Sequence, residues 1–168
     1  MTWDEYFINL LDYISIKSKD KTKTSAIIVG NEHEIRSTGF NGMVRGMNES
    51  DPIKWEKPEK YHWVEHAERN AIYNAARMGN SVNGCTMYVS HFPCVDCARG
   101  IIQSGIVEVI ISPKNINAFR KADSIYQDHE SRTIEMFRQA KVSLVIYGED
   151  NLNGDMLEKE DLDNLWGV

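Results

Sequence analysis

Two short segments of this sequence carry residues that could hold a metal ion and move protons. The first places His66 and Glu68 two residues apart, and the second places Cys94 and Cys97 three residues apart, directly after Pro93. One imidazole and two thiolates suit zinc, and a catalytic zinc with three protein ligands keeps its fourth position open for water. A carboxylate that does not bind the metal can pass protons to and from that water. The pattern predicts a catalytic zinc centre with His66, Cys94 and Cys97 as ligands and Glu68 as acid and base.

Three other interpretations fit parts of the same pattern. Two cysteines at this spacing also form redox pairs, but a redox pair leaves His66 and Glu68 without a role. A closed structural zinc site would use Cys85 as its fourth ligand, although Cys85 precedes an apolar strand and a buried free cysteine is common. Glu68 alone would suit a helix N-terminus because of the helix dipole. We favour the catalytic centre because it accounts for all four residues.

The spacing of the ligands indicates how two helices position them. Cys94 and Cys97 share one face of a helix, and Pro93 suits the first turn of that helix, where its missing N–H has no partner. His66 begins a second helix in the same way. The positive end of a helix dipole lowers the pKa of a thiol and favours metal binding. We therefore expect two helix N-termini to face one ion.

Hydrophobic spacing predicts the elements that carry these segments. The expected helices span residues 3–14, 65–78, 94–103 and 131–140. The expected strands span residues 25–30, 34–40, 86–89, 106–111 and 142–147. Residues 41–61 are expected to form a long loop, which in a compact domain is usually functional or mobile. This order predicts an α/β fold, a three-layer α/β/α sandwich with a mixed central sheet of about five strands.

Composition limits the class of protein. The chain has 168 residues, of which 26% are charged and 42% hydrophobic, which is ordinary for one soluble domain. No apolar stretch is long enough to cross a membrane, and the N-terminus lacks the pattern of a secretory signal. Three cysteines, two of them in a ligand motif, favour a reducing compartment, so we expect a cytoplasmic protein.

The charge is distributed unevenly and suggests a boundary. Residues 149–168 carry seven acids and one base, which accounts for the net charge of −6, and the remaining chain has 18 of each sign. We expect a zinc-binding body over residues 1–147, followed by an acidic extension over 148–168. A neutral body with an acidic end does not favour nucleic-acid binding, which usually shows a basic face.

Over residues 3–147 the chain resembles the cytidine and deoxycytidylate deaminase superfamily, and within it the deoxycytidylate (dCMP) deaminases most. The zinc motifs carry the resemblance to the superfamily. Softer matches favour the dCMP subfamily, such as the Gly-Phe-Asn-Gly loop at 39–42 and the segment 101–106. The matching segments are residues 39–42, 65–72, 86–89, 93–98 and 101–106.

The resemblance implies an activity and a cofactor. The activity is zinc-dependent hydrolytic deamination of dCMP to dUMP and ammonia, which feeds thymidylate synthesis. Glu68 would move protons to N3 of the pyrimidine and then to the leaving amine. Some relatives hold a second zinc through cysteines near the N-terminus, but no cysteine precedes Cys85, so we expect one zinc per chain. The resemblance also implies a homo-oligomer, often a hexamer, with dCTP and dTTP as effectors together with Mg²⁺.

Further residues are candidates for contact with the nucleotide, Asn41 and Ser90 by resemblance to the family and the others by their position in the sequence. Asn41 would bind the 3′-hydroxyl, although an Asn-Gly turn explains it equally well. Asn70 would lie near the pocket floor, and the carbonyl of Ser90 would accept a hydrogen bond from the amino group. Tyr126 would stack on the base, although a place in the core explains an aromatic residue there equally well. Arg45 is our first candidate for the phosphate. The further phosphate candidates are Arg77, Arg120 and Lys121.

Several other functions compete with this prediction. One is deamination of a base in tRNA or single-stranded nucleic acid, and another is deamination of a different cytosine nucleotide such as dCTP. Deaminases of free cytidine usually carry a cysteine where this chain has His66, which argues against that activity. A zinc module that only binds a partner would not need Glu68.

Overall fold

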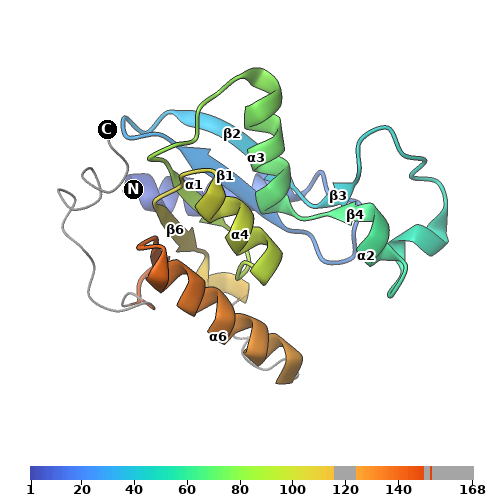
Figure 1. The fold of residues 1–168 in the computed structure, drawn as a ribbon. Helices are drawn as coiled ribbons and strands as arrows, with labels where there is room; N and C mark the ends of the chain where they lie inside the picture. The colour runs from blue at the N-terminus through green and yellow to red at the C-terminus, as the bar shows by residue number, and fades with distance from the viewer. Residues whose placement is uncertain (116–123, 150–151, 153–168) are drawn as a thin grey trace.

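A five-stranded sheet with helices on both faces forms the body of the molecule (Figure 1). The structure is a computed structural model that describes residues 1–115, 124–149 and 152, without the side chains of residues 124–128. Across the sheet, the strands are β2 (Ile35–Phe40), β1 (Ser25–Val29), β5 (Thr86–Val89), β6 (Glu108–Ile111) and β7 (Ser143–Ile146). β1 pairs antiparallel with β2 and β5, whereas β5, β6 and β7 run parallel. The sheet is mixed, as predicted.

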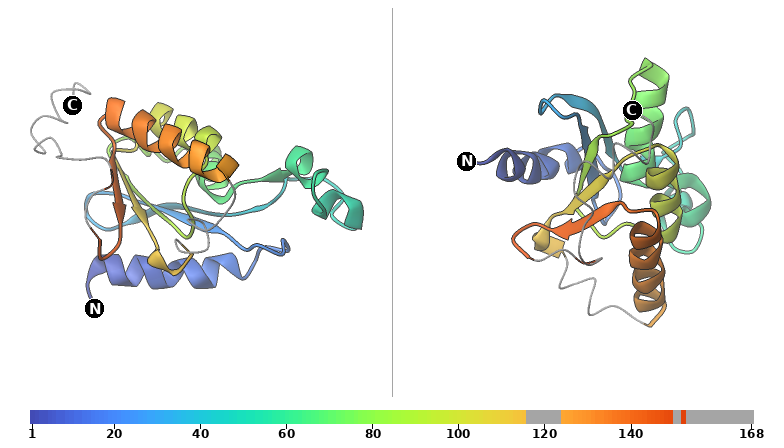
Figure 2. Two further views of the ribbon diagram at one scale, coloured as in Figure 1. Left: turned by 90° about the horizontal axis from the view of Figure 1, so that it is seen from below. Right: turned by 60° about the vertical axis from the view of Figure 1, so that its left-hand side comes forward.

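The helices lie in two layers on either side of this sheet (Figure 2). One layer is α1 (Trp3–Ser15), which packs on β1 and β5. The other layer consists of α3 (Ala67–Met78), α4 (Val95–Gln103) and α6 (Ser124–Gln139). Of these, α3 packs on β1 and β2 and α6 on β7, with α4 in contact with both helices. The three-layer α/β/α prediction is confirmed.

The inner strand β1 supplies both layers of the core. All five of its residues are buried, and successive side chains of a strand point to opposite faces. Ile27 and Val29 therefore join the cluster under α1, whereas Ala26 and Ile28 join the larger cluster under α3, α4 and α6. A short apolar run without polar alternation is the sequence pattern of a strand covered on both faces.

The N-terminal helix is fixed by a cap and by a buried hydrogen bond. Thr2 Oγ1 accepts from the backbone N–H of Glu5 at 3.1 Å, and the Glu5 carboxylate accepts from the N–H of Thr2 at 2.8 Å. Tyr88 of β5 donates its hydroxyl to Asp4 at 2.6 Å. Burial of the phenol raises the pKa of Tyr88. The helix is thus attached directly to the central strands.

The segment between β2 and α3, predicted as a loop, contains short elements. β3 (Gly42–Met43) pairs antiparallel with β4 (Val64–Glu65), and between them lie η1 (Pro52–Trp55) and α2 (Lys60–Trp63). The pairing brings both ends of the segment together directly before α3. The predicted final helix, 131–140, begins earlier in the structure, at Ser124. Within the described parts of the chain, no helix has the length and apolar character needed to span a membrane.

Candidate active site

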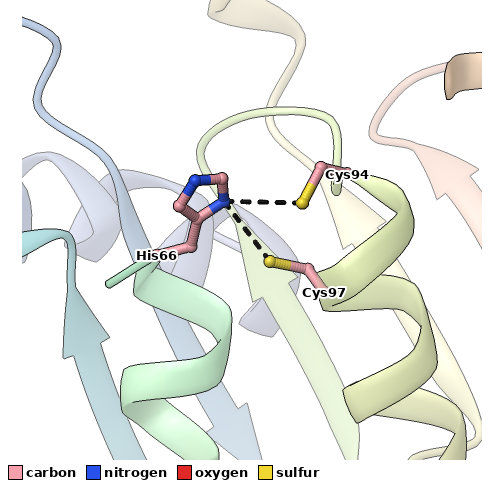
Figure 3. A group of neighbouring side chains, drawn as sticks. All are labelled: His66, Cys94 and Cys97. Carbon is pink, nitrogen blue, oxygen red and sulfur yellow. Dashed lines mark hydrogen bonds between the residues drawn. The ribbon is translucent and has the colours of Figure 1, made fainter. Parts of the chain in front are cut away.

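The predicted metal ligands meet at the N-termini of two adjacent helices (Figure 3). His66 is the N-cap residue of α3, Cys94 is the N-cap residue of α4, and Cys97 lies in the first turn of α4. The His66 Nδ1 atom lies 3.5 Å from the Sγ atom of each cysteine. Pro93 precedes the cap instead of starting the helix, because Cys94 itself has extended backbone angles, φ −74° and ψ 169°.

These distances fit a zinc ion. Tetrahedral coordination with Zn–N near 2.0 Å and Zn–S near 2.3 Å requires the nitrogen and sulfur atoms to lie ~3.5 Å apart. The three ligand atoms all lie within 4.8 Å of one another. Among the residues described, no fourth protein ligand belongs to this group. Cys85 is buried at the opposite end of β5 from Cys94, so it does not complete a closed site. All three cysteines are free thiols.

Glu68 stands beside this group without belonging to it. It lies in the first turn of α3 and is buried, with 6% of its surface exposed. Burial raises the pKa of Glu68, and the neighbouring His66 opposes this effect. A carboxyl group whose pKa is raised by burial suits a role as both acid and base.

The thiols are set in a polarised environment. Hydrogen bonds with Cys97 and with His66 hold the pKa of Cys94 well below the usual range of a thiol. Arg69 approaches from α3, and its Nη1 lies 3.5 Å from the Sγ of Cys97. Its Nε donates to Glu65 at 2.6 Å, and the same carboxylate accepts from the backbone N–H of His66 at 2.9 Å. Glu65 and Arg69 thus connect the two ligand-bearing helices.

A cavity of about 270 Å³ opens beside His66, Glu68 and Cys94. Two of the predicted substrate residues, Asn41 and Ser90, line it. The remaining lining residues are Asp20, Thr22, Thr24, Ser25, Lys57, Lys60, Tyr61, Val64, His91, Phe92, Pro93 and His129. The cavity therefore combines a candidate metal centre with polar and cationic side chains.

Asn41 and Ser90 are held in place by backbone hydrogen bonds. The Asn41 amide accepts from the N–H of Thr24 and donates to the carbonyl of Thr22, both at 2.8 Å. Ser90 Oγ accepts from the N–H of Ser25 at 2.8 Å, and the Ser90 carbonyl accepts from Asn115 at 3.2 Å. Each amide or carbonyl oxygen keeps a second lone pair, so both residues can still bind a ligand in the cavity.

The other predicted substrate residues lie elsewhere. Arg45, Asn70 and Arg77 line a second hollow on the outer side of α3. There Arg45 donates to Asn74 at 2.8 Å, and Asn70 donates to the carbonyl of Phe40 at 2.9 Å. The structure does not bring these residues to the cavity of His66. Arg120, Lys121 and the side chain of Tyr126 lie outside the described residues.

Residues that the sequence analysis missed take the place of Arg45 in the cavity. Lys57 and Lys60 reach it from the segment before α3, Asp20 reaches it from the segment after α1, and His129 reaches it from α6. Their separation in the sequence left no local pattern by which to group them. The only signal was the expectation that a loop as long as 41–61 carries function.

Together, the fold and the site define a zinc-binding α/β domain in which a buried carboxylate, which is not one of the ligands, lies beside three metal ligands. Comparison with known proteins agrees with this class. Residues 1–113 match the family model of the cytidine and deoxycytidylate deaminase zinc-binding region. The chain belongs to this family.

Individual relatives and a solved structure show how similar the chain is to particular proteins. Human deoxycytidylate deaminase is 41% identical over 117 residues, which are 66% of this chain and 64% of the human protein, so the match spans less than two thirds of that relative. The ComE operon protein 2 of Bacillus subtilis is 26% identical over 170 residues, 100% of this chain and 83% of that protein. The apo dCMP deaminase of cyanophage S-TIM5 superposes with a TM-score of 0.64 at 26% identity, covering 84% of this chain and 94% of that one.

Proposed function

We propose that this protein is a zinc-dependent deaminase that converts dCMP to dUMP and ammonia. The observation that carries the proposal is the buried Glu68, which shares one cavity with His66 and Cys94 in a chain of the deaminase family. A non-catalytic zinc module would have no use for a free carboxylate at this position. A redox pair would have no use for the histidine.

The chemistry of the proposal uses residues of the chain itself. Zinc held by His66, Cys94 and Cys97 would act as a Lewis acid that makes hydroxide available at neutral pH. Glu68 would hold the proton that the attacking water gives up and deliver it to N3 of the pyrimidine. It would then take up the second proton of that water, as C4 becomes a carbonyl, and give it to the exocyclic amine, which leaves as ammonia. The carbonyl of Ser90 would orient that amine, and Asn41 would bind the sugar.

Two observations support a cytosine nucleotide as substrate. The relatives include deoxycytidylate deaminases, and the S-TIM5 enzyme has been solved in complex with dCMP and dUMP. The cavity also carries Lys57 and Lys60, which suit a phosphate group. These two lysines replace Arg45 as our candidates for phosphate binding. Arg45 and Asn70, which line the second hollow, remain candidates only for an indirect role.

The wider setting belongs to the same proposal. The dUMP product would feed thymidylate synthesis, and the three free thiols suit a reducing cytoplasm. By resemblance to the family, we propose a homo-oligomer with dCTP and dTTP as effectors together with Mg²⁺. Residues 148–168 would form an acidic extension outside the deaminase body.

The proposal can be tested by replacing Glu68. We expect E68Q to keep its zinc and to lose about 10²–10⁴-fold in kcat on dCMP, because general acid–base catalysis contributes about that much. Ultraviolet assays on dCMP, CMP, dCTP, deoxycytidine and a cytosine-containing oligonucleotide would give the substrate class, and metal analysis would give the zinc content. E32Q, which makes the same change at an exposed glutamate, serves as the matched control. Near-normal turnover of E68Q, or strong preference for the oligonucleotide, would contradict the proposal.

A further inference from the structure

A buried aspartate forms part of the wall of the active-site cavity. The side chain of Asp20 is 2% exposed, and both of its oxygens accept from Lys60 Nζ, at 3.0 and 2.7 Å. The Oδ1 atom also accepts from the backbone N–H of Thr22 at 3.0 Å. The carboxylate is therefore fixed by three contacts and cannot turn away from a ligand in the cavity without breaking them.

The lysine that it holds is also largely buried. The Lys60 side chain is 17% exposed, and the residue lines the same cavity as Lys57. Other lysine–carboxylate pairs of this region, such as Lys21 with Glu56, are well exposed. An exposed pair costs little, whereas a buried pair needs compensation for the water that both charges lose. A role in ligand binding would account for the presence of such a buried pair in the cavity wall.

The pair sets the charge that a ligand meets. Among the described residues that line the cavity, the formal charges away from the metal centre are two lysines and one aspartate. Lys57 and Lys60 attract an anion, but Asp20 cancels one of their charges. The net of about one positive charge is suited to a phosphomonoester, which carries about −1.5 to −2 at pH 7.

A triphosphate would bring more negative charge against the same fixed carboxylate. Two like charges a few ångströms apart repel even at an effective dielectric constant of about 20, and a repulsion of about 1.4 kcal/mol already corresponds to a tenfold change in affinity. We propose that Asp20, through its pair with Lys60, makes the site select 5′-monophosphates of cytosine nucleosides over triphosphates. The inference rests on the proposed deamination and identifies Lys60 as a phosphate-binding residue and Asp20 as a specificity-determining one.

The first test removes the negative charge and keeps the shape. We expect D20N to raise kcat/KM for dCTP relative to dCMP by about tenfold, with each nucleotide supplied alone and its product separated by chromatography. The matched control is D12N, because Asp12 also pairs with a lysine, Lys114, but lies on the surface of α1. An unchanged ratio in folded, zinc-loaded D20N, or a wild type that prefers dCTP, would overturn the inference.

The second test removes the cation. We expect K60Q to raise KM for dCMP about tenfold or more while leaving kcat/KM for deoxycytidine, which has no phosphate, near the wild-type value. Equal losses on both substrates would contradict a phosphate-binding role for Lys60.

Calorimetric affinities of dCMP and dCTP, measured on E68Q with and without D20N, separate this inference from the proposed function. They report charge selection without turnover. A wild type that deaminates none of these compounds would refute the deaminase proposal, and the same affinities would still decide the role of Asp20.

Discussion

At the scale of single residues, the metal centre depends on a pair that does not bind metal. Two thiolates and a neutral imidazole carry two negative charges, which a dication would balance, and a thiolate in a partly buried site is stabilised further by a hydrogen-bonding cation. Arg69 supplies it, with its guanidinium 3.5 Å from the Sγ of Cys97. Glu65 holds Arg69 through an ion pair and at the same time accepts from the backbone of His66.

This arrangement predicts the effect of R69Q on metal affinity. Loss of the guanidinium leaves the Cys97 thiolate less stabilised, so we expect zinc to bind about 10–100-fold more weakly, as is typical when outer-sphere partners of metal ligands are removed. Competition with a chromophoric chelator measures this directly. R99Q is the control, because it removes the same kind of side chain from a well-exposed position of α4, where Arg99 pairs with Asp96. Equal affinities in wild type and R69Q would show that the arginine is only structural.

The residue scale also shows what a sequence can and cannot indicate. The placement of His66 beside Glu68 and of Cys94 beside Cys97 was predictable, because each pair sits within one helical turn. Asp20 and Lys60 were not, since 40 residues separate them and only the folded backbone brings them together. Arg45 was chosen because it follows the Asn-Gly loop closely, yet the backbone carries it to the outer side of α3.

At the scale of elements, the position of α3 depends on a close approach to β2. Gly39 of β2 lies so near the helix that a Cβ atom there would stand 2.3 Å from the carbonyl oxygen of Ala67 and 2.4 Å from the nitrogen of Ala71. Both contacts are to helix backbone, which cannot move aside as a side chain can. Ser37 adds a hydrogen bond from its Oγ to the Ala71 carbonyl at 2.7 Å. His66 immediately precedes this helix, so the contact also places a metal ligand.

We therefore expect G39A to affect both stability and metal binding. The extra methyl group must push α3 away from the sheet, at a cost of about 1–3 kcal/mol or more in the free energy of unfolding. Denaturant unfolding measures this cost, and zinc analysis shows whether His66 has moved. G100A is the matched control, since a Cβ there would meet only side-chain atoms at 3.7 Å or more, and the helix gains about 0.5–1 kcal/mol from the substitution. A G39A protein as stable as wild type would contradict the close contact.

Most elements of the sheet and its helices were predictable from the spacing of their apolar residues, and the exceptions are elements without a clear spacing. β1 and β6 are apolar runs bounded by polar turns, and α1 has a regular apolar stripe, so periodicity identified them. The β3–β4 pair has two residues in each strand, which is too short for any periodic pattern. α6 begins at Ser124, before its apolar positions recur clearly, and the helix packs against α4.

At the scale of the whole molecule, the metal ligands come from the two helices that flank the central strands on one face. α3 packs on β1 and β2, and α4 lies between α3 and α6 over the same core cluster. That cluster contains buried residues from every strand of the five-stranded sheet except β2, so the core does not need the metal to form. The ion would instead link two helix N-termini that the core already brings together. There, His66 Nδ1 lies 3.5 Å from the Sγ atoms of Cys94 and Cys97.

Removal of zinc should therefore destabilise the protein without unfolding it. A ligand present at 1,000 times its Kd stabilises the native state by about 4 kcal/mol, and a chelator removes that contribution. We expect the Tm to fall by several degrees while the far-ultraviolet circular dichroism at 25 °C keeps its shape, unlike small zinc domains that unfold without metal. The variant C94S, which lacks one ligand, should resemble the chelated wild type and respond little to chelator. Complete unfolding on chelation would mean that the core alone does not hold α3 and α4 together, whereas an unchanged Tm would mean that no ion links them.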